Sequence, residues 1–506
     1  MAELDGRPFP PGRYPLVVVG SGPGGMQLTY CLTRLGARHA AISADDAPGG
    51  MFRKWPVFQR MLSWTKPHPG FQPGSSEFER TDWNSLAGDE VEHRGLMAGV
   101  MDGTSYFPSR PEMQSGLELF AQRTGLRVRY GCRWEATRKE GDDFVLSTSD
   151  GEYRTRRIVF AVGVAEPWRP PIPGMEHAAL YGELRPVEAY ADRRVFIIGK
   201  QNSGFEIASG LLPWARQIIL ASPSSTKLSV NTHSLVGVRA RYVQPVEDAV
   251  LAGGVVILDA SIEEVKRTAD GVDVRVRTTA DKPLQFIVDD VIAATGFTSP
   301  LRDLAQLGVT TFGQSRLPAQ TAFWESIAVP GIYFAGTINQ GAKGLMKHGI
   351  PSNSGAAQGY RYNARVLARH LAETQGIKAD RPTIAADEVI PTLLHEARYG
   401  PEVWHQRSYL ARVISFDGDG GIVNEGILPL VHFLDGGQFD RAAAMTLESN
   451  GREDLYPVVY VRHGGKVHET RLPDDPFLNF ETREHRATLA GALEPLLSPS
   501  LSRPRG

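Results

Sequence analysis

Cysteine is nearly absent from this chain of 506 residues, which contains only Cys31 and Cys132. The two lie far apart in the sequence, so they form no Cys-x-x-Cys redox pair and no disulfide framework. A thiolate metal site is excluded for the same reason, and we predict no metal site. The lack of a redox pair separates this chain from enzymes that reduce disulfides through two neighbouring cysteines.

Long apolar runs and an excess of one charge are also lacking. No stretch approaches the ~18 uninterrupted apolar residues of a membrane-spanning helix, and the first residues lack the apolar core of a signal peptide. The chain has 55 Lys and Arg against 57 Asp and Glu, a net charge of −2, which gives no field to hold a polyanion. We therefore expect a cytoplasmic protein that binds neither nucleic acid nor membrane.

A glycine-rich segment follows the first apolar run. Residues 16–19 (LVVV) predict a buried strand, and the sequence GSGPGG at 20–25 leads into a helix. In such a turn Gly20 permits the sharp bend, Gly22 lets the main chain approach a pyrophosphate, and Gly25 lets helix and strand pack closely. The next strand ends at Ser43, so either this hydroxyl or the Asp45 carboxylate accepts from a ribose. Asp45 is equally well interpreted as a solvated loop carboxylate.

A second unit of the same kind begins at residue 194. VFIIG (195–199) runs into KQNSG (200–204), so the outer glycines are Gly199 and Gly204, while Gln201 occupies the middle position. The next strand ends in SPSSTK (222–227), where Ser222 and Lys227 are placed to hold a 2′-phosphate, which favours NADPH over NADH. A polar surface loop is the alternative. Arg239 and Arg241 lie downstream and are further candidates for this phosphate.

Two nested dinucleotide-binding domains usually mean that one holds a flavin while the other delivers hydride to it. Two later strands end in glycine, VIAATGF (291–297) and IYFAGT (332–337), as if the chain returned to its first domain. The sequence therefore predicts an α/β fold with two nested Rossmann-like domains plus a C-terminal α+β region. The predicted boundaries are 14–190 and 291–375 for the FAD-binding domain, 191–290 for the inserted NAD(P)H-binding domain and 376–506 for the C-terminal region. A hairpin is predicted at 458–472, with its turn at Gly464 and Gly465.

The order of these motifs resembles that of a known family. GSGPGG, GGMFRKW (49–55), VFAVG (159–163), VIAATGF and IYFAGT together are similar to the flavin-containing monooxygenase and N-hydroxylase superfamily. DWNSL (82–86), YFPSRPEM (106–113), GKQNSGFEIA (199–208) and LSVNTHSLVG (228–237) more closely resemble the FAD-dependent oxidoreductases typified by the endoplasmic-reticulum flavoprotein associated with degradation. The chain lacks that relative's secretory signals and the F-x-G-x-x-x-H fingerprint of other monooxygenases, so the resemblance is at superfamily level.

The resemblance implies the positions of the cofactors. It places the FAD pyrophosphate on the first glycine turn, Trp55 and Trp64-Thr65-Lys66 near the isoalloxazine, and Gly336-Thr337 near the ribityl chain, with Thr337 where relatives often carry Asp. The predicted cofactor-binding set for FAD and NADPH is Gly20, Gly22, Gly25, Asp45, Met51, Trp55, Thr65, Gly163, Gly199, Ser203, Gly204, Ser222, Lys227, Arg239, Thr295, Gly296, Gly336 and Thr337.

A basic segment follows the last flavin strand. Residues 339–349 carry several glycines and three cationic side chains, so they predict either an active-site rim that attracts an anion or a solvated basic loop. His233, after Asn231-Thr232, is open to a catalytic or a structural interpretation in the same way. The predicted catalytic set is Lys66, Asn202, Lys343, Lys347 and His348.

These features and the resemblance predict an NADPH-dependent FAD monooxygenase. It would form a flavin C4a-hydroperoxide with O₂ and oxygenate a small nucleophile, with N-hydroxylation of an amine or amino acid that carries an acid group as the favoured reaction. The alternatives are an FAD/NADPH oxidoreductase or oxidase without oxygen insertion, and a non-catalytic flavoprotein that acts as an interaction module. A homo-oligomer is compatible with the sequence.

Overall fold

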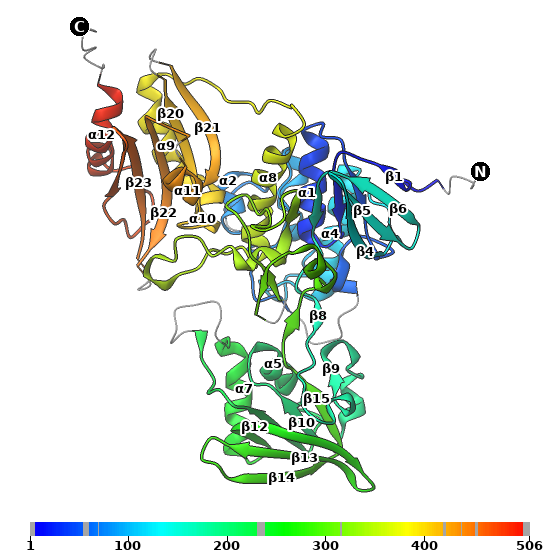
Figure 1. Ribbon diagram of the computed structural model, residues 1–506. Coiled ribbons are helices and arrows are strands. Elements are labelled where there is room, and N and C mark those ends of the chain that lie inside the picture. Colours follow the sequence, from blue (N-terminus) through cyan, green and yellow to red (C-terminus); the bar gives the residue numbers. More distant parts are fainter. Residues whose placement is uncertain are drawn as a thin grey trace. The chain divides into compact units, whose positions relative to one another are not determined.

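The computed structural model describes residues 6–53, 60–68, 70–229, 238–313, 316–417, 421–436, 438–450 and 454–498. Trp55 and His233 lie outside these ranges. The chain forms two compact units, the first from Met1–Gly50, Met61–Val164 and Ser299–Gly506 and the second from Met51–Arg60 and Ala165–Thr298. Figure 1 shows helices and strands in both, and the predicted α/β fold class is confirmed.

A four-stranded parallel sheet lies at the centre of the first unit. Its order is β19 (Ile332–Phe334), β7 (Ile158–Phe160), β2 (Val17–Val19) and β3 (Ala40–Ile42). Every residue of these strands is buried, which explains why they are unbroken apolar runs in the sequence. β19 comes from the far side of the inserted unit, so the return of the chain to its first sheet is confirmed.

Helices cover this sheet, and a small sheet packs beside it in which β1 and β6 are parallel and the other neighbours antiparallel. α1 (Pro23–Arg34) packs along α8 (Ala357–Glu373), and α4 (Arg110–Thr124) packs against α1. The second sheet has the order β1 (Gly12–Arg13), β6 (Gly151–Thr155), β5 (Asp143–Thr148) and β4 (Trp134–Glu140). The shorter elements of this unit are α2 (Ser76–Glu79), α3 (Leu96–Val100), β17 (Thr311–Phe312), β18 (Leu317–Pro318), η1 (Gly50–Arg53, which reaches into the second unit), η2 (Val91–His93), η6 (Arg302–Leu307), η7 (Gly336–Gly341) and η8 (Lys347–Gly349).

The second unit is a seven-stranded sheet with a parallel half and an antiparallel half. Its order is β14 (Pro283–Val288), β13 (Gly271–Thr278), β12 (Val255–Thr268), β11 (Gln217–Ser222), β10 (Arg194–Ile198), β15 (Asp290–Ala293) and β9 (Ala179–Leu180). The helices are α5 (Asn202–Leu211) and α7 (Ala240–Leu251), with the short turns η3 (Met175–His177), η4 (Tyr181–Glu183) and η5 (Val187–Tyr190). β8 (Glu166–Pro167) pairs with β16 (Phe297–Thr298). This unit begins at residue 165 and ends at residue 298, so it is wider than the predicted range 191–290. Short β9 has no apolar run to reveal it at the start. At the end, the strand of VIAATGF was predicted to return to the first domain, but it is β15 and pairs with β10 in this sheet.

The C-terminal region is an antiparallel sheet between helices. Its order is β21 (Ile422–Pro429), β20 (Leu410–Phe416), β22 (Ala442–Ser449), β23 (Leu455–His463) and β24 (Lys466–Arg471). α9 (Val389–Tyr399), α10 (Pro401–His405) and α12 (Arg483–Leu497) cover one face and α11 (Leu430–Asp435) the other, with η9 (Ala386–Glu388) before α9. Alternate residues of β22 point to the two cores, as the period of a strand requires. The β23–β24 hairpin is confirmed, since Gly464 and Gly465 both have positive φ, 59° and 75°, between paired His463 and Lys466.

Candidate functional site

The first glycine turn connects β2 to α1. At Gly20, φ is +112°, and a Cβ would lie 2.5 Å from the carbonyl oxygen of Ala161. A Cβ on Gly25 would overlap the carbonyl oxygen of Gly20, whereas one on Gly22 would have no described atom within 4 Å beyond its own neighbours. The first turn of α1 carries no acidic side chain, so its free N–H groups favour an anion. The turn therefore has the open space and the donors that a pyrophosphate needs.

A fourth glycine in this turn was not assigned a role from the sequence. A Cβ on Gly24 would overlap Cα of Gly336, which follows β19 and has φ +81°. The turn and the end of β19 therefore approach main chain to main chain. Thr337 follows directly, and its side chain contacts the hydroxyl of Tyr360, whose pKa is raised by burial. The repeated glycine in GSGPGG and the glycine of IYFAGT are the signals that could have revealed this contact.

The two candidate ribose acceptors lie together. Ser21 donates to the Ser43 hydroxyl oxygen at 2.8 Å, and the Ser43 hydroxyl donates to Asp45 Oδ2 at 3.3 Å. Asp45 Oδ2 also lies within 3.5 Å of the position that a Cβ on Gly50 would take, near Gly22. Ser43 and Asp45 are therefore members of one hydrogen-bonded chain that begins at the glycine turn.

Tyr130 borders the same corner and was missed in the sequence. Its hydroxyl is buried and has no hydrogen-bond partner among the described residues. Burial raises the pKa of Tyr130 to about 12, and the charge of Asp45 adds to this effect. A buried donor without a partner costs about 1–3 kcal/mol, so this hydroxyl suits a polar group of a bound nucleotide. The one sequence feature that could have indicated Tyr130 is its place after Arg129, which forms a β-bridge with Ile42 of β3.

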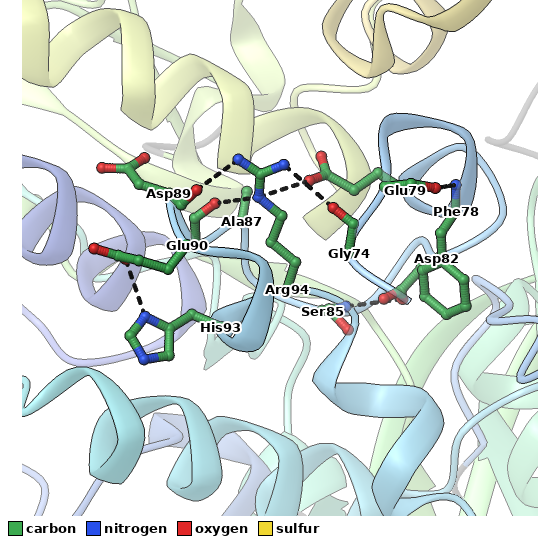
Figure 2. Close-up of polar contacts among 12 residues, drawn as sticks. Gly74, Phe78, Glu79, Asp82, Ser85, Ala87, Asp89, Glu90, His93 and Arg94 are labelled. Carbon is green, nitrogen blue, oxygen red and sulfur yellow. Dashed lines mark hydrogen bonds and ion pairs between the residues drawn. The ribbon is translucent and has the colours of Figure 1, made fainter. Parts of the chain in front are cut away.

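A buried polar cluster surrounds Thr65. The Thr65 hydroxyl donates to Asp82 Oδ1 at 2.8 Å, and the Asn84 side-chain amide donates to Thr65 Oγ1 at 3.1 Å. The main-chain N–H groups of Asn84 and Ser85 also donate to Asp82 Oδ1, at 3.2 and 3.1 Å. Asp82 is fully buried, and its Oδ2 has no partner in the described part of the chain. Figure 2 shows Asp82 turned towards Ser85.

A buried arginine holds the loop that carries this cluster. Arg361 in α8 is 1% exposed, and it donates to the carbonyl oxygens of Ser85, Glu79 and Asp82 at 2.7, 3.2 and 2.8 Å. The cluster is thereby fixed to the helix that follows the last flavin strand. By contrast, Lys66 is exposed, with its Nζ 5.6 Å from the centre of the Trp64 ring. Neither Asp82 nor Arg361 was singled out in the sequence, because DWNSL was used only as a family motif.

The basic segment after β19 is arranged differently from the open rim that the sequence predicts. Lys347 Nζ donates to Glu448 Oε2 at 2.9 Å and to Glu469 Oε1 at 2.7 Å, and Tyr460 completes the cluster at 2.5 Å. Glu448 is 1% exposed, so the charge of Lys347 is neutralised by the C-terminal sheet. His348 Nε2 lies 3.3 Å from the Tyr456 hydroxyl. Lys343 is exposed.

The second glycine turn repeats the packing of the first. Gly199 has φ +117°, and its Cβ would overlap the carbonyl oxygen of Ala294, while a Cβ on Gly204 would overlap that of Gly199. Asn202, predicted to be catalytic, accepts the Arg239 main-chain N–H at 3.1 Å, at the start of α7. Ser203 lies beside it in the first turn of α5.

A carboxylate lies next to the predicted 2′-phosphate loop. Asp259 in β12 accepts the Ser225 hydroxyl at 3.0 Å and pairs with Lys200, which is 1% exposed. Lys227 is exposed and Ser222 ends β11. Burial lowers the pKa of Arg239, and the neighbouring charge of Arg241 lowers it further. Arg239 Nε has no partner in the described residues, so this guanidinium suits an anion.

The remaining predicted cofactor residues lie at turns. Met51 is in η1, and Gly163 follows β7 with φ +70°. The Thr295 hydroxyl donates to the carbonyl oxygen of Trp168, and the Trp168 N–H donates to the carbonyl oxygen of Gly296 at 2.9 Å. Thr295 and Gly296 thus join the β8–β16 ribbon. Both cysteines are buried and free. Within the described ranges no cluster of potential metal ligands occurs, and no helix has the length and apolarity to cross a membrane.

Known proteins are similar to this chain in sequence or in fold. A mouse protein, FAD-dependent oxidoreductase domain-containing protein 2, is 26% identical over 389 residues, which cover 70% of this chain and 57% of that protein. The chain thus spans little more than half of that relative's length. The bacillithiol disulfide reductase Bdr (YpdA) of Staphylococcus aureus has a TM-score of 0.56 at 14% identity, covering 72% of this chain and 99% of the other. A flavin-containing monooxygenase of Stenotrophomonas maltophilia has a TM-score of 0.53 at 21% identity with the same coverage.

The family assignment rests on a match that includes both glycine turns. The sequence profile of one family, described as pyridine nucleotide-disulphide oxidoreductase, matches residues 17–336, from β2 through the inserted unit to the end of β19. These are the elements that bring Gly24 and Gly336 together. The chain therefore belongs to the pyridine nucleotide-disulphide oxidoreductase family.

Proposed function

We propose that this chain is an NADPH-dependent FAD monooxygenase that oxygenates a small nucleophile, with N-hydroxylation of an amine or amino acid as its reaction. The single observation that carries the proposal is the pair of glycine turns with matched outer packing in a chain whose two cysteines form no redox pair. In this proposal each glycine turn holds one nucleotide, and O₂ takes the electrons that no cysteine pair can accept.

The residues of the first unit fit FAD. The open space at Gly22 and the N-terminus of α1 accept the pyrophosphate, while the chain from Ser21 through Ser43 to Asp45 accepts bonds from the ribose. The orphaned Tyr130 hydroxyl suits the nucleotide end of the molecule. When bound, FAD supplies hydride acceptance and oxygen activation.

Asp82 is the side chain of this chain best suited to orient a reacting group beside that chemistry. One of its oxygens accepts three hydrogen bonds and the other accepts none among the described residues. Because the carboxylate is fully buried, water does not reach it freely. The resemblance brings its partner Thr65 towards the isoalloxazine, so the unpartnered oxygen of Asp82 would orient a reacting group there through a hydrogen bond.

A second candidate is an NADPH-oxidising flavoprotein that inserts no oxygen. The pairing of Lys347 with Glu448 and Glu469 favours it, since this lysine is not available to hold an anionic substrate. Lys343 and Lys66 are exposed and remain candidates to bind an anionic substrate.

One experiment separates these functions. The purified protein is supplied with NADPH and a panel of amines and amino acids, and we measure NADPH oxidation, hydrogen peroxide and the masses of the products. A monooxygenase gives a product heavier by one oxygen atom and less peroxide when its substrate is present. Peroxide in one-to-one yield with NADPH, with every compound of the panel, would establish an oxidase instead.

A further inference from the structure

A polar cavity lies in the first unit between α2, α8 and the helices α9 and α10. Its volume is about 210 Å³, roughly seven times the ~30 Å³ that one water occupies in the liquid. The charged side chains that line it are Glu79, Arg94, Arg365, Glu396, Glu402 and Arg412. None of them belongs to the glycine turns or to the Thr65 cluster, so the cavity is separate from the proposed flavin chemistry.

Glu396 has one oxygen satisfied and one orphaned. Arg412 donates to Glu396 Oε2 through Nε at 2.8 Å and lies 2.6 Å from it through Nη2. Oε1 has no partner in the described chain, although Glu396 is only 5% exposed. Burial raises the pKa of Glu396 and the charge of Glu402 raises it further, against the opposing effect of Arg412. A buried carboxylate oxygen of this kind requires a hydrogen-bond donor from outside the protein.

The arginines around the cavity have already used their donors. Arg94 donates to the carbonyl oxygens of Gly88, Gly74 and Asp89 at 2.8, 3.2 and 2.7 Å, and its Nε lies 3.6 Å from Glu79 Oε1. Figure 2 shows the Arg94 guanidinium between the segments of Gly74 and Asp89, with Glu79 beside it. The N–H donors of Arg94 are therefore largely taken up by the main chain.

The guanidinium of Arg365 is also paired, in its case with two carboxylates. Its Nη2 lies 3.2 Å from Asp89 Oδ1, and its Nη1 lies 3.4 Å from Glu402 Oε1. Burial alone would lower the pKa of Arg365, but the charges of Glu402 and Glu79 raise it above its ordinary value. Three carboxylates and three guanidinium groups thus line the cavity, and the orphaned Glu396 Oε1 is an acceptor with spare capacity.

We propose that this cavity binds a small molecule through a primary ammonium group, with Glu396 Oε1 and the Glu402 carboxylate as the acceptors. An ammonium group brings three N–H donors, and a donor is what the orphaned oxygen lacks. Its positive charge makes a hydrogen bond to a carboxylate stronger than that of a neutral donor. The volume suits a short diamine or the side chain of a basic amino acid. A neutral alcohol of the same length could replace water there but would bring no charge.

The test uses the full chain with its flavin. Isothermal titration calorimetry and thermal unfolding are followed with 1,4-diaminobutane, and with 1,4-butanediol and succinate as matched neutral and anionic probes. We expect the diamine to bind and to raise the unfolding temperature, and the other two to do neither. No binding of the diamine, or equal binding of the diol, would overturn the proposal and leave a cavity filled by water.

Two variants locate the site. Glu396→Gln should weaken diamine binding at least about tenfold, because a charge-assisted bond is worth about 1.5–3 kcal/mol. If that variant does not fold, Glu402→Gln gives the same test on the more accessible carboxylate. The control is Glu425→Gln. Glu425 lies on β21 and its carboxylate binds Ser415 and Arg381, so this variant should leave diamine binding unchanged. Unchanged binding in a folded cavity variant would place the amine elsewhere, whatever the outcome for oxygenation.

Discussion

The two glycine turns agree at their outer positions and differ at the middle one. In both, the first glycine has a φ near +115° and its Cβ would meet the carbonyl oxygen of an alanine at the end of a neighbouring strand, Ala161 or Ala294. In both, the last glycine would meet the carbonyl oxygen of the first. Gly22 in one turn has open space, whereas the other has Gln201 as the residue before α5. The outer glycines are therefore required by the strand-to-helix turn. The residue at the middle position determines how closely a phosphate can approach the main chain.

The largest expected effect is at the middle of the first turn. Gly22→Val adds a side chain in open space, so folding should be unaffected while FAD affinity falls on the order of a hundredfold, about 2.7 kcal/mol. Flavin absorbance per protein and the unfolding temperature of the apoprotein measure the two effects. Gly99→Val, also at a glycine with open space, is the control and should keep its flavin. Full flavin occupancy in Gly22→Val would contradict the role given to the middle position of the turn.

An outer position should respond in the opposite way. Gly204→Val would press a side chain onto the carbonyl oxygen of Gly199, and overpacking of this kind costs about 1–3 kcal/mol. Urea unfolding measures the loss, which we expect in the second unit while the first keeps its flavin. Gly182→Val, in the same unit but with open space, should be neutral. Loss of nucleotide binding without loss of stability would contradict the role given to the outer glycines.

The loop after β11 should set the choice of nucleotide. Lys227→Met removes an exposed cation, so the KM for NADPH should rise about tenfold and that for NADH should stay the same, since only NADPH carries the 2′-phosphate. Flavin reduction in a stopped-flow instrument measures both. An equal effect on the two nucleotides would remove Lys227 from the phosphate site.

The smallest expected effect is at the middle of the second turn. Gln201→Gly removes an exposed side chain and lets a pyrophosphate approach α5 more closely, so the KM for NADPH should fall by a few-fold, under about 1.4 kcal/mol. The kcat should not change, because no reacting group is removed. A higher KM would mean that Gln201 itself binds the nucleotide.

These contrasts also explain what could be predicted from the sequence. Gly20, Gly25, Gly199 and Gly204 were predictable because their roles depend on chain neighbours and on one adjacent strand, which an apolar run followed by glycine reveals. The hairpin at Gly464 was predictable for the same local reason. Asp82 was not, because its importance lies in one unsatisfied oxygen, which no residue pattern displays.

Long-range polar contacts were beyond the sequence for a related reason. Arg361 contacts Ser85, 276 positions away, and Lys347 contacts Glu448, 101 positions away. A pattern of charges along the chain cannot say which carboxylate faces which cation after folding. The basic segment of residues 339–349 therefore predicts either an anion-attracting rim or a solvated basic loop, and neither alternative includes the pairing of Lys347 with Glu448 and Glu469.

The Lys347 cluster has a consequence for the history of the chain. Glu448 and Tyr460 are buried, they are hydrogen-bonded to each other, and both contact Lys347. A substitution at any of the three positions therefore leaves a charge or a hydroxyl without its partner. Related chains should therefore exchange these three positions together, and a relative without the C-terminal sheet has no reason to keep lysine at position 347. The co-occurrence of Lys347, Glu448 and Tyr460 would mark the lineage in which this sheet became part of the flavoprotein.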